Sequence, residues 1–89
     1  RPEEAFFWAT QSQAELDLFF IKGGKRIGFE FKYTDSPKIS KSMRIALEDL
    51  RLDALFIIYP GTIIFPLGTK ITACGLDSIT SKEFLKFFS

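Results

Sequence analysis

Residues 14–33 of this chain read AELDLFFIKGGKRIGFEFKY, and this stretch decides the fold. Two apolar runs flank Gly23 and Gly24, and both glycines accept the positive φ that a tight primed turn between two strands requires. The segment therefore predicts a β-hairpin in which Lys22 faces Lys25. A four-residue loop centred on the same glycines would leave the pairing of the two strands unchanged.

Side chains alternate across a strand, which assigns each hairpin residue to one of two faces. We expect a core face that carries Leu16, Leu18, Phe20, Ile27, Phe29 and Phe31. We expect the opposite face to carry Glu15, Asp17, Phe19, Ile21, Arg26, Gly28, Glu30 and Lys32. This opposite face is charged at the end of the hairpin that lies away from the turn.

The same register places Asp17 opposite Glu30 and Glu15 opposite Lys32. Two carboxylates directly opposite each other destabilise a sheet, whereas Glu15 and Lys32 attract. A divalent cation held between Asp17 and Glu30 would remove the repulsion, because hard oxygen ligands suit magnesium or manganese. The alternative is an ordinary, partly exposed sheet face, in which water separates the two carboxylates.

Asp17 followed by the Glu30-Phe31-Lys32 segment resembles the core of the PD-(D/E)xK nuclease superfamily. A closer resemblance is to the uncharacterised domain at the C-terminus of many bacterial and archaeal AAA-type ATPases. This resemblance covers most of the chain and is carried by residues 7–10 (FWAT), 14–18 (AELDL), 29–32 (FEFK), 42–50 (SMRIALEDL) and 59–61 (YPG). The chain departs from the superfamily at Leu16, which stands where that pattern has proline, and it has no match for the acidic residue of a preceding helix.

The resemblance implies a restriction-endonuclease-like α/β fold that lacks the first core helix. Such a fold has a mixed β-sheet, made of an antiparallel meander and a parallel crossover, and flanking helices. The resemblance also implies metal-dependent cleavage of DNA, with Asp17, Glu30 and Lys32 as catalytic residues. Asp17, Glu30 and the backbone carbonyl of Phe31 would hold magnesium or manganese, and Glu15 would be an accessory residue. An upstream ATPase domain in the same chain would bind ATP.

Two other functions stay open at this point. The first is a non-catalytic C-terminal module of an AAA-type ATPase that binds nucleic acid or a protein partner. The second is a folding or dimerisation domain that uses an aromatic C-terminal helix. An acidic residue upstream of the chain, close to Asp17 in the fold, would favour the nuclease. A Lys32 side chain turned away from the carboxylates would favour the non-catalytic module.

Length and composition are those of one small domain over residues 1–89, since 46% of the 89 residues are hydrophobic. The chain opens with Arg1 rather than Met, so we expect it to be part of a longer protein. The chain has no histidine, which excludes histidine general bases and histidine-based nucleophile pairs within it. A lone cysteine, Cys74, and the lack of any apolar run of membrane-spanning length favour a cytoplasmic protein that does not enter a membrane.

Basic residues are concentrated between Lys22 and Arg44, where seven Lys and Arg accompany two acidic residues. A basic region of this kind can follow a phosphate backbone, so DNA is the expected partner. The residues expected to contact it are Arg26, Lys38, Lys41 and Arg44. On charge alone, a solvated surface explains the same residues.

The rest of the chain predicts a parallel crossover. Residues 38–51 carry a helical apolar stripe, formed by Ile39, Met43, Ala46, Leu47 and Leu50. We expect this helix to begin with Asp35 or Ser36 as its N-cap and Pro37 as its first residue. Residues 54–59 are apolar throughout, which indicates a strand buried on both faces and parallel to residues 25–33. The remaining predictions are a strand at 5–10, a short extended segment at 62–65, an edge strand at 70–74 and a terminal helix that starts at Ser78 or Ser81.

Overall fold

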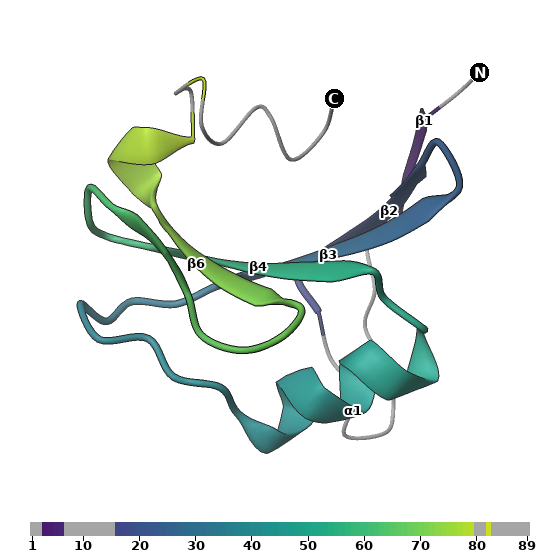
Figure 1. Ribbon diagram of the computed structural model, residues 1–89, viewed down its shortest axis with the longest axis horizontal. Coiled ribbons are helices and arrows are strands. Elements are labelled where there is room, and N and C mark those ends of the chain that lie inside the picture. Colours follow the sequence, from purple (N-terminus) through teal and green to yellow (C-terminus); the bar gives the residue numbers. More distant parts are fainter. Residues whose placement is uncertain (1–2, 7–15, 80–81, 83–89) are drawn as a thin grey trace.

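The computed structural model describes residues 3–6, 16–79 and 82 of the chain. Its elements are β1 (Glu3–Phe6), β2 (Leu18–Lys22), β3 (Lys25–Phe31), α1 (Lys41–Asp49), β4 (Ala54–Tyr59), β5 (Ile64–Pro66), β6 (Ile71–Gly75) and the short 3₁₀ helix η1 (Leu76–Ser78). The strands form one mixed sheet in the order β1-β2-β3-β4-β6-β5, and α1 lies across one face of it (Figure 1). The mixed α/β class predicted from the sequence is confirmed.

The hairpin forms as the two glycines predict. Gly23 and Gly24 have φ values of 58° and 81°, and Lys22 pairs with Lys25. The strand β1 pairs antiparallel with β2, so the first three strands form the expected meander. The strand predicted at residues 5–10 begins earlier, because β1 covers Glu3–Phe6, and residues 7–10 lie outside the described part of the chain.

The parallel crossover is also confirmed. The strand β4 pairs parallel with β3, with Phe31 beside Ile58, and α1 connects the end of β3 to the start of β4. The helix begins later than predicted, because its N-cap is Ser40 rather than Asp35 or Ser36. Ser40 has an extended backbone, and its hydroxyl oxygen accepts the Met43 N–H at 3.2 Å. A side-chain acceptor at this position stabilises the first turn, which places the helix start there.

One prediction about the strands beyond β4 was wrong. The strand predicted at residues 70–74 is β6, but it is not an edge strand, because it lies between β4 and β5. The edge is β5, a strand of only three residues that ends in Pro66. A short strand with proline is suited to an edge, since proline cannot donate to a further strand. After β6 the chain forms η1, and most of the terminal helix predicted from Ser78 or Ser81 lies outside the described residues.

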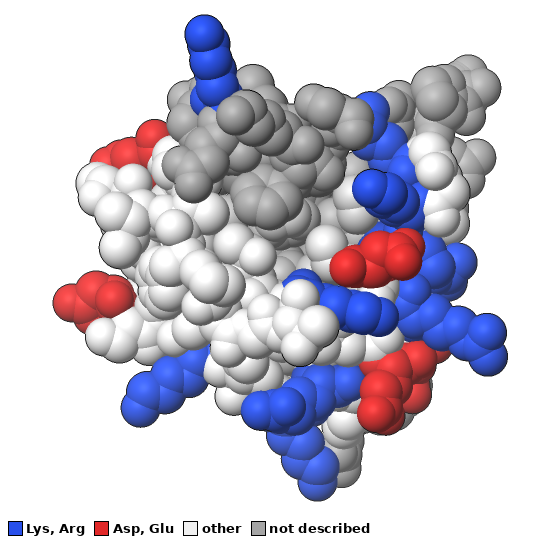
Figure 2. All heavy atoms as spheres, viewed as in Figure 1, with Lys and Arg blue, Asp and Glu red and all other residues white. Residues whose placement is uncertain are grey.

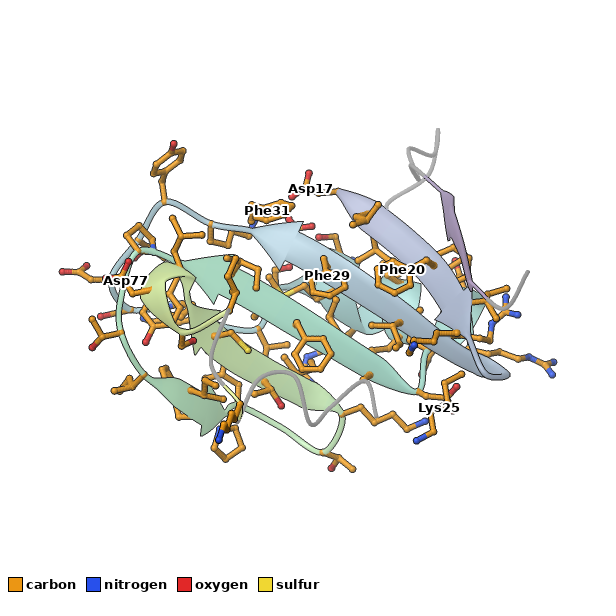
Figure 3. All side chains as sticks on the ribbon, turned by 90° about the horizontal axis from the view of Figure 1, so that it is seen from above. Asp17, Phe20, Lys25, Phe29, Phe31 and Asp77 are labelled. Carbon is orange, nitrogen blue, oxygen red and sulfur yellow. The ribbon has the colours of Figure 1, made fainter. Side chains whose placement is uncertain are left out.

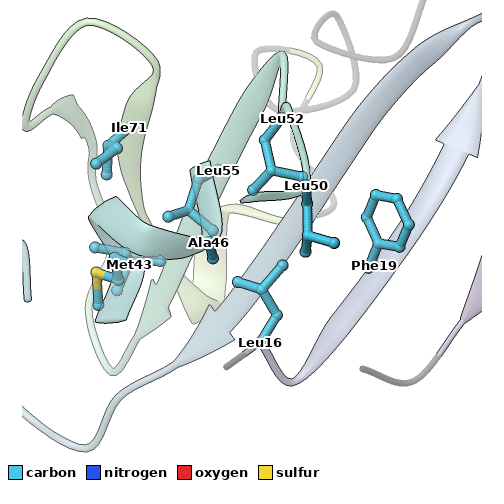
Figure 4. Close-up of a cluster of buried hydrophobic side chains, with 9 residues drawn as sticks. Leu16, Phe19, Met43, Ala46, Leu50, Leu52, Leu55 and Ile71 are labelled. Atoms are coloured by element: carbon cyan, nitrogen blue, oxygen red, sulfur yellow. The ribbon is translucent and has the colours of Figure 1, made fainter. Parts of the chain in front are cut away.

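Apolar side chains fill both faces of the sheet. The cluster on the α1 face contains Leu16, Phe19, Met43, Ala46, Leu50, Leu52, Leu55, Ile57 and Ile71 (Figure 4). The cluster on the other face contains Ile27, Phe29, Phe56, Ile58 and Cys74. The strand β4 contributes to both clusters, as its continuous apolar sequence predicted. Because Phe19 is buried under α1, the prediction that only one face of the hairpin is core was wrong.

A local break in strand pairing explains a second difference in the hairpin. The Asp17 N–H donates to the Phe29 carbonyl at 3.1 Å, although Phe29 already pairs with Leu18. Two consecutive residues therefore face one, as at a β-bulge, and the extra residue reverses the alternation of side chains. Leu16 consequently lies on the α1 face with Leu52, and not on the face of Phe29 where the sequence placed it.

Candidate functional site

Three parallel strands, β3, β4 and β6, end at the same side of the sheet. We call this side the carboxyl edge; it is formed by Phe31, Tyr59 and Gly75 together with the residues that follow them. In open α/β sheets, ligands bind outside the carboxyl ends of the strands. Glu30 and Phe31 end β3 and Lys32 follows it, so all three residues lie here. This edge is therefore the first place to look for a functional site.

Asp17 lies at this edge, but not in the regular ladder that the hairpin register predicted. Its carboxylate Oδ2 accepts the backbone N–H of Phe31 at 2.8 Å, and Figure 3 shows the two residues side by side at the ends of β2 and β3. That N–H belongs to the peptide bond between Glu30 and Phe31. The Asp17 carboxylate therefore lies against the backbone that carries Glu30, while the side chain itself is exposed.

Glu30 and Lys32 form an ion pair on β3 and the residue after it. The Lys32 Nζ lies 3.2 Å from Glu30 Oε2, and their side chains are 38% and 14% exposed. Residues two apart on a strand share a face, which is why this pair can form. The Lys32 N–H also donates to the Ile58 carbonyl at 2.9 Å, so the backbone below the pair is held by β4. Lys32 is thus turned toward a carboxylate rather than away from it.

Asp17 and Glu30, the two carboxylates of the predicted metal site, both lie at the carboxyl edge. Among the described residues, no group of three or more His, Cys, Asp or Glu could hold a metal ion, so these two carboxylates would have to be sufficient. Magnesium is bound by one or two carboxylates and retains several waters, so two acidic side chains are sufficient for it. Glu15, the predicted accessory residue, lies outside the described residues.

A pocket that the sequence analysis did not predict opens at the carboxyl edge. Its volume is about 240 Å³, and its lining comes from all three strand ends: Phe31, Lys32 and Tyr33 after β3, Ile58, Tyr59 and Pro60 after β4, and Leu76 after β6. We call it the edge pocket. Phe31 is 55% exposed although the hairpin pattern placed it in the core. The sequence signal for the pocket was only that an aromatic residue ends each of two neighbouring parallel strands.

The four basic residues predicted to bind nucleic acid do not come together in one patch. Arg26 lies at the far end of β3, where its Nε donates to the Leu50 carbonyl at 2.6 Å and its guanidinium lies over the Phe19 ring. Leu50 caps the end of α1, whereas Lys41 is its first residue, so the nine-residue helix separates Arg26 from Lys41.

Lys38 and Arg44 are exposed, as Lys41 is, and lie with it before and on the first half of α1. In Figure 2, Lys and Arg side chains also gather at the side of the molecule where Figure 1 shows the β2–β3 turn and the end of α1. The crossover therefore separates Lys38 and Lys41 from Arg26, and gives Arg26 a structural role at the far end of α1.

Residues 1–79 match the family described as a domain of unknown function, DUF4143. The chain belongs to the DUF4143 family. Two curated relatives, uncharacterised proteins of Mycobacterium bovis and Mycobacterium tuberculosis, are each 47% identical to it over 78 residues. The match covers 88% of this chain and 18% of each relative, so the DUF4143 chain spans less than a fifth of the length of the relatives it matches.

No solved structure matches this DUF4143 chain. None of the helices that the structure describes is long and apolar enough to cross a membrane.

Proposed function

We propose that this DUF4143 domain is a restriction-endonuclease-like domain that cleaves phosphodiester bonds of DNA with the help of magnesium or manganese, as one part of a larger ATPase. Two observations carry the proposal: the Glu30–Lys32 ion pair at the carboxyl edge, and the Asp17 carboxylate on the peptide N–H between Glu30 and Phe31. The lysine contacts one carboxylate, and the other carboxylate contacts the intervening backbone. Resemblance to PD-(D/E)xK nucleases and to the C-terminal domains of AAA-type ATPases supports the same assignment.

The geometry supports a proposed role for each residue. Asp17 Oδ2 is engaged by the Phe31 N–H, which orients the carboxylate and leaves Oδ1 as the oxygen for a cation. Glu30 supplies the second carboxylate from β3. A divalent ion bound by these oxygens would lower the pKa of a bound water and polarise a phosphoryl oxygen. The Lys32 ammonium, held within 3.2 Å of Glu30, would stabilise negative charge that develops on the phosphate.

The test combines metal binding with cleavage. Millimolar magnesium or manganese should raise the Tm of the wild-type protein, because a ligand that binds only the folded state stabilises it. Asp17→Asn should lose this shift, whereas Asp49→Asn, which changes an exposed aspartate at the far end of α1, should keep it. Lys32→Ala should keep much of the shift but lose cleavage, since lysine is not a metal ligand. Absence of any metal-induced shift in the wild type would refute the metal site.

One observation favours a second candidate, a non-catalytic module of the ATPase that binds nucleic acid or a protein partner. Asp17 and Lys32 each have a structural partner in the fold, the Phe31 N–H and the Glu30 carboxylate. Both residues could therefore serve the end of the hairpin alone. DNA binding that is equal in the wild type and in Asp17→Asn, with no metal effect on either, would favour this module over the nuclease.

A further inference from the structure

The described lining of the edge pocket is apolar or aromatic apart from Lys32. Of the residues that line it, Phe31 and Leu76 are 55% and 53% exposed, and Tyr33 is fully exposed. Large apolar side chains that are exposed together mark interaction sites, because leaving them in water costs free energy. Of the described residues that line the pocket, Lys32 is the only charged one. A suitable ligand therefore offers a flat or apolar group next to a negative charge.

The position of the pocket relates it to the proposed cleavage site. Lys32 belongs to both, since it lines the pocket and its Nζ pairs with Glu30. Phe31 also belongs to both: its side chain lines the pocket, and its backbone N–H holds the Asp17 carboxylate. A group bound in the pocket would thus lie next to a phosphate bound at Asp17, Glu30 and Lys32.

We infer that the edge pocket receives an unpaired base of the nucleic acid substrate, so that the domain prefers single-stranded or unpaired DNA to a continuous duplex. This inference rests on the proposed function, because the phosphate next to the bound base would be the one that Asp17, Glu30 and Lys32 bind. A nucleotide matches the pocket because its base has an apolar face that stacks on aromatic rings and its phosphate carries the negative charge. At about 240 Å³ the pocket is below the usual range for drug-sized ligands, which suits one base rather than a larger molecule.

The stacking of bases inside a duplex explains why the pocket should prefer unpaired strands. A base inside a duplex is covered on both faces by its neighbours, so an enzyme that binds its face must first unstack it at the cost of a few kcal/mol. An unpaired base meets no such cost. Phe31, whose half-exposed ring lies at the end of β3 next to Asp17 in Figure 3, is the side chain we expect the base to contact first.

The experiment measures binding without divalent metal, so that it does not depend on cleavage. A single-stranded oligonucleotide that contains the fluorescent base 2-aminopurine is titrated with the protein and compared with the same sequence as a duplex. We expect tighter binding of the single strand and a change of 2-aminopurine fluorescence as the base stacks. Phe31→Ala and Phe31→Leu should weaken binding by about fivefold or more, the effect of losing one aromatic–base stack.

Matched variants separate stacking from other effects. Phe31→Tyr keeps a flat ring and should bind as the wild type does, whereas Phe31→Leu keeps apolar surface but has no ring. Ile63→Ala removes an equally exposed apolar side chain that does not line the pocket, and it should change nothing. Circular dichroism confirms that each variant is folded before binding is measured.

The outcomes distinguish this inference from the proposed function. Equal binding of single strand and duplex, or wild-type affinity in Phe31→Leu, overturns the base pocket whether or not cleavage occurs. Phe31-dependent stacking without metal-dependent cleavage of any DNA keeps the pocket and overturns the proposed catalysis. Phe31-dependent binding of an acidic peptide with an aromatic residue, with no effect of Phe31 on the oligonucleotide, assigns the pocket to a protein partner instead.

Discussion

Replacing Gly75 by alanine should be among the most damaging single-methyl changes in this fold. A Cβ at Gly75 would lie 2.4 Å from the carbonyl carbon and oxygen of Gly61 and 2.5 Å from the Thr62 nitrogen. The backbone of Gly75 has φ −62° and ψ 141°, which alanine adopts without strain, so the cost is steric alone. The atoms in the way are backbone atoms, and they cannot move aside by a side-chain rotation.

The magnitude follows from what must move. The loop after β4 is held against β6 and η1 by two hydrogen bonds, from the Gly75 N–H to the Ile63 carbonyl at 2.8 Å and from the Asp77 N–H to the Gly61 carbonyl at 3.2 Å. Overpacking of a tight site costs about 1–3 kcal/mol, and each weakened hydrogen bond adds about 1 kcal/mol. We expect a loss of about 3 kcal/mol, which lowers the Tm of a domain of this size by roughly 12–24 °C.

Gly28→Ala is the matched control, because it adds the same methyl group to another buried glycine. Its Cβ would lie 2.7 Å from Leu16 Cδ1 and 3.0 Å from Leu52 Cδ1, which are the ends of flexible side chains. Rotation of the two leucines relieves most of this contact, so the expected loss is about 1 kcal/mol. Urea unfolding followed by circular dichroism measures both variants. A Gly75→Ala protein as stable as the wild type, or more stable than Gly28→Ala, would refute the steric reasoning.

Three further predictions concern single hydrogen bonds. Asp17→Asn keeps an oxygen acceptor for the Phe31 N–H, whereas Asp17→Ala removes it. In metal-free urea unfolding, we therefore expect Asp17→Ala to lose about 0.5–1 kcal/mol more of its unfolding free energy than Asp17→Asn. Equal stabilities of the two variants would mean that this hydrogen bond contributes nothing. Ser40→Ala removes the N-cap of α1 and should cost about 1 kcal/mol, while Ser36→Ala, at the cap position that the sequence suggested, should leave urea unfolding unchanged. Arg26→Ala should lose about 1–2 kcal/mol, because Nε no longer reaches the Leu50 carbonyl and the guanidinium no longer covers Phe19. An exposed-site control for the last variant is Arg44→Ala, which should unfold as the wild type does.

Local rules were enough to predict much of the fold from the sequence. The Gly23-Gly24 turn set the hairpin register, because a primed turn that needs two positive φ values leaves little choice of pairing. The apolar stripe through Met43 and Ala46 marked the buried side of α1. The continuous apolar run of β4 indicated a strand covered on both faces, which only a parallel crossover with a helix would provide.

The same rules predicted how two of the candidate site residues lie relative to each other. Glu30 and Lys32 lie two residues apart on and after β3, and alternation alone requires that they share a face. Asp17 was expected near them from the hairpin register, and the structure keeps it at the same end of the hairpin. Their chemical roles stay proposals that the metal and cleavage experiments test.

Other features depended on contacts between distant parts of the chain. The β-bulge at Asp17 turns Leu16 toward Leu52, a residue 36 positions later that the hairpin sequence cannot anticipate. The start of α1 at Ser40 rather than near Pro37 depends on how the helix seats Met43 in the core, since several residues before it were acceptable caps. The place of β6 inside the sheet follows from β5 folding back beside it.

The edge pocket is the clearest case of a feature that only the tertiary structure decided. By alternation Phe31 reads as a core residue, like Phe29 two positions before it, and Phe29 is indeed buried. Phe31 is half exposed because it is the last residue of its strand, where the sheet and its neighbours no longer cover it. Alternation assigns a side chain to a face of the sheet, but burial also requires other elements above that face, and those come from β4, β6 and η1.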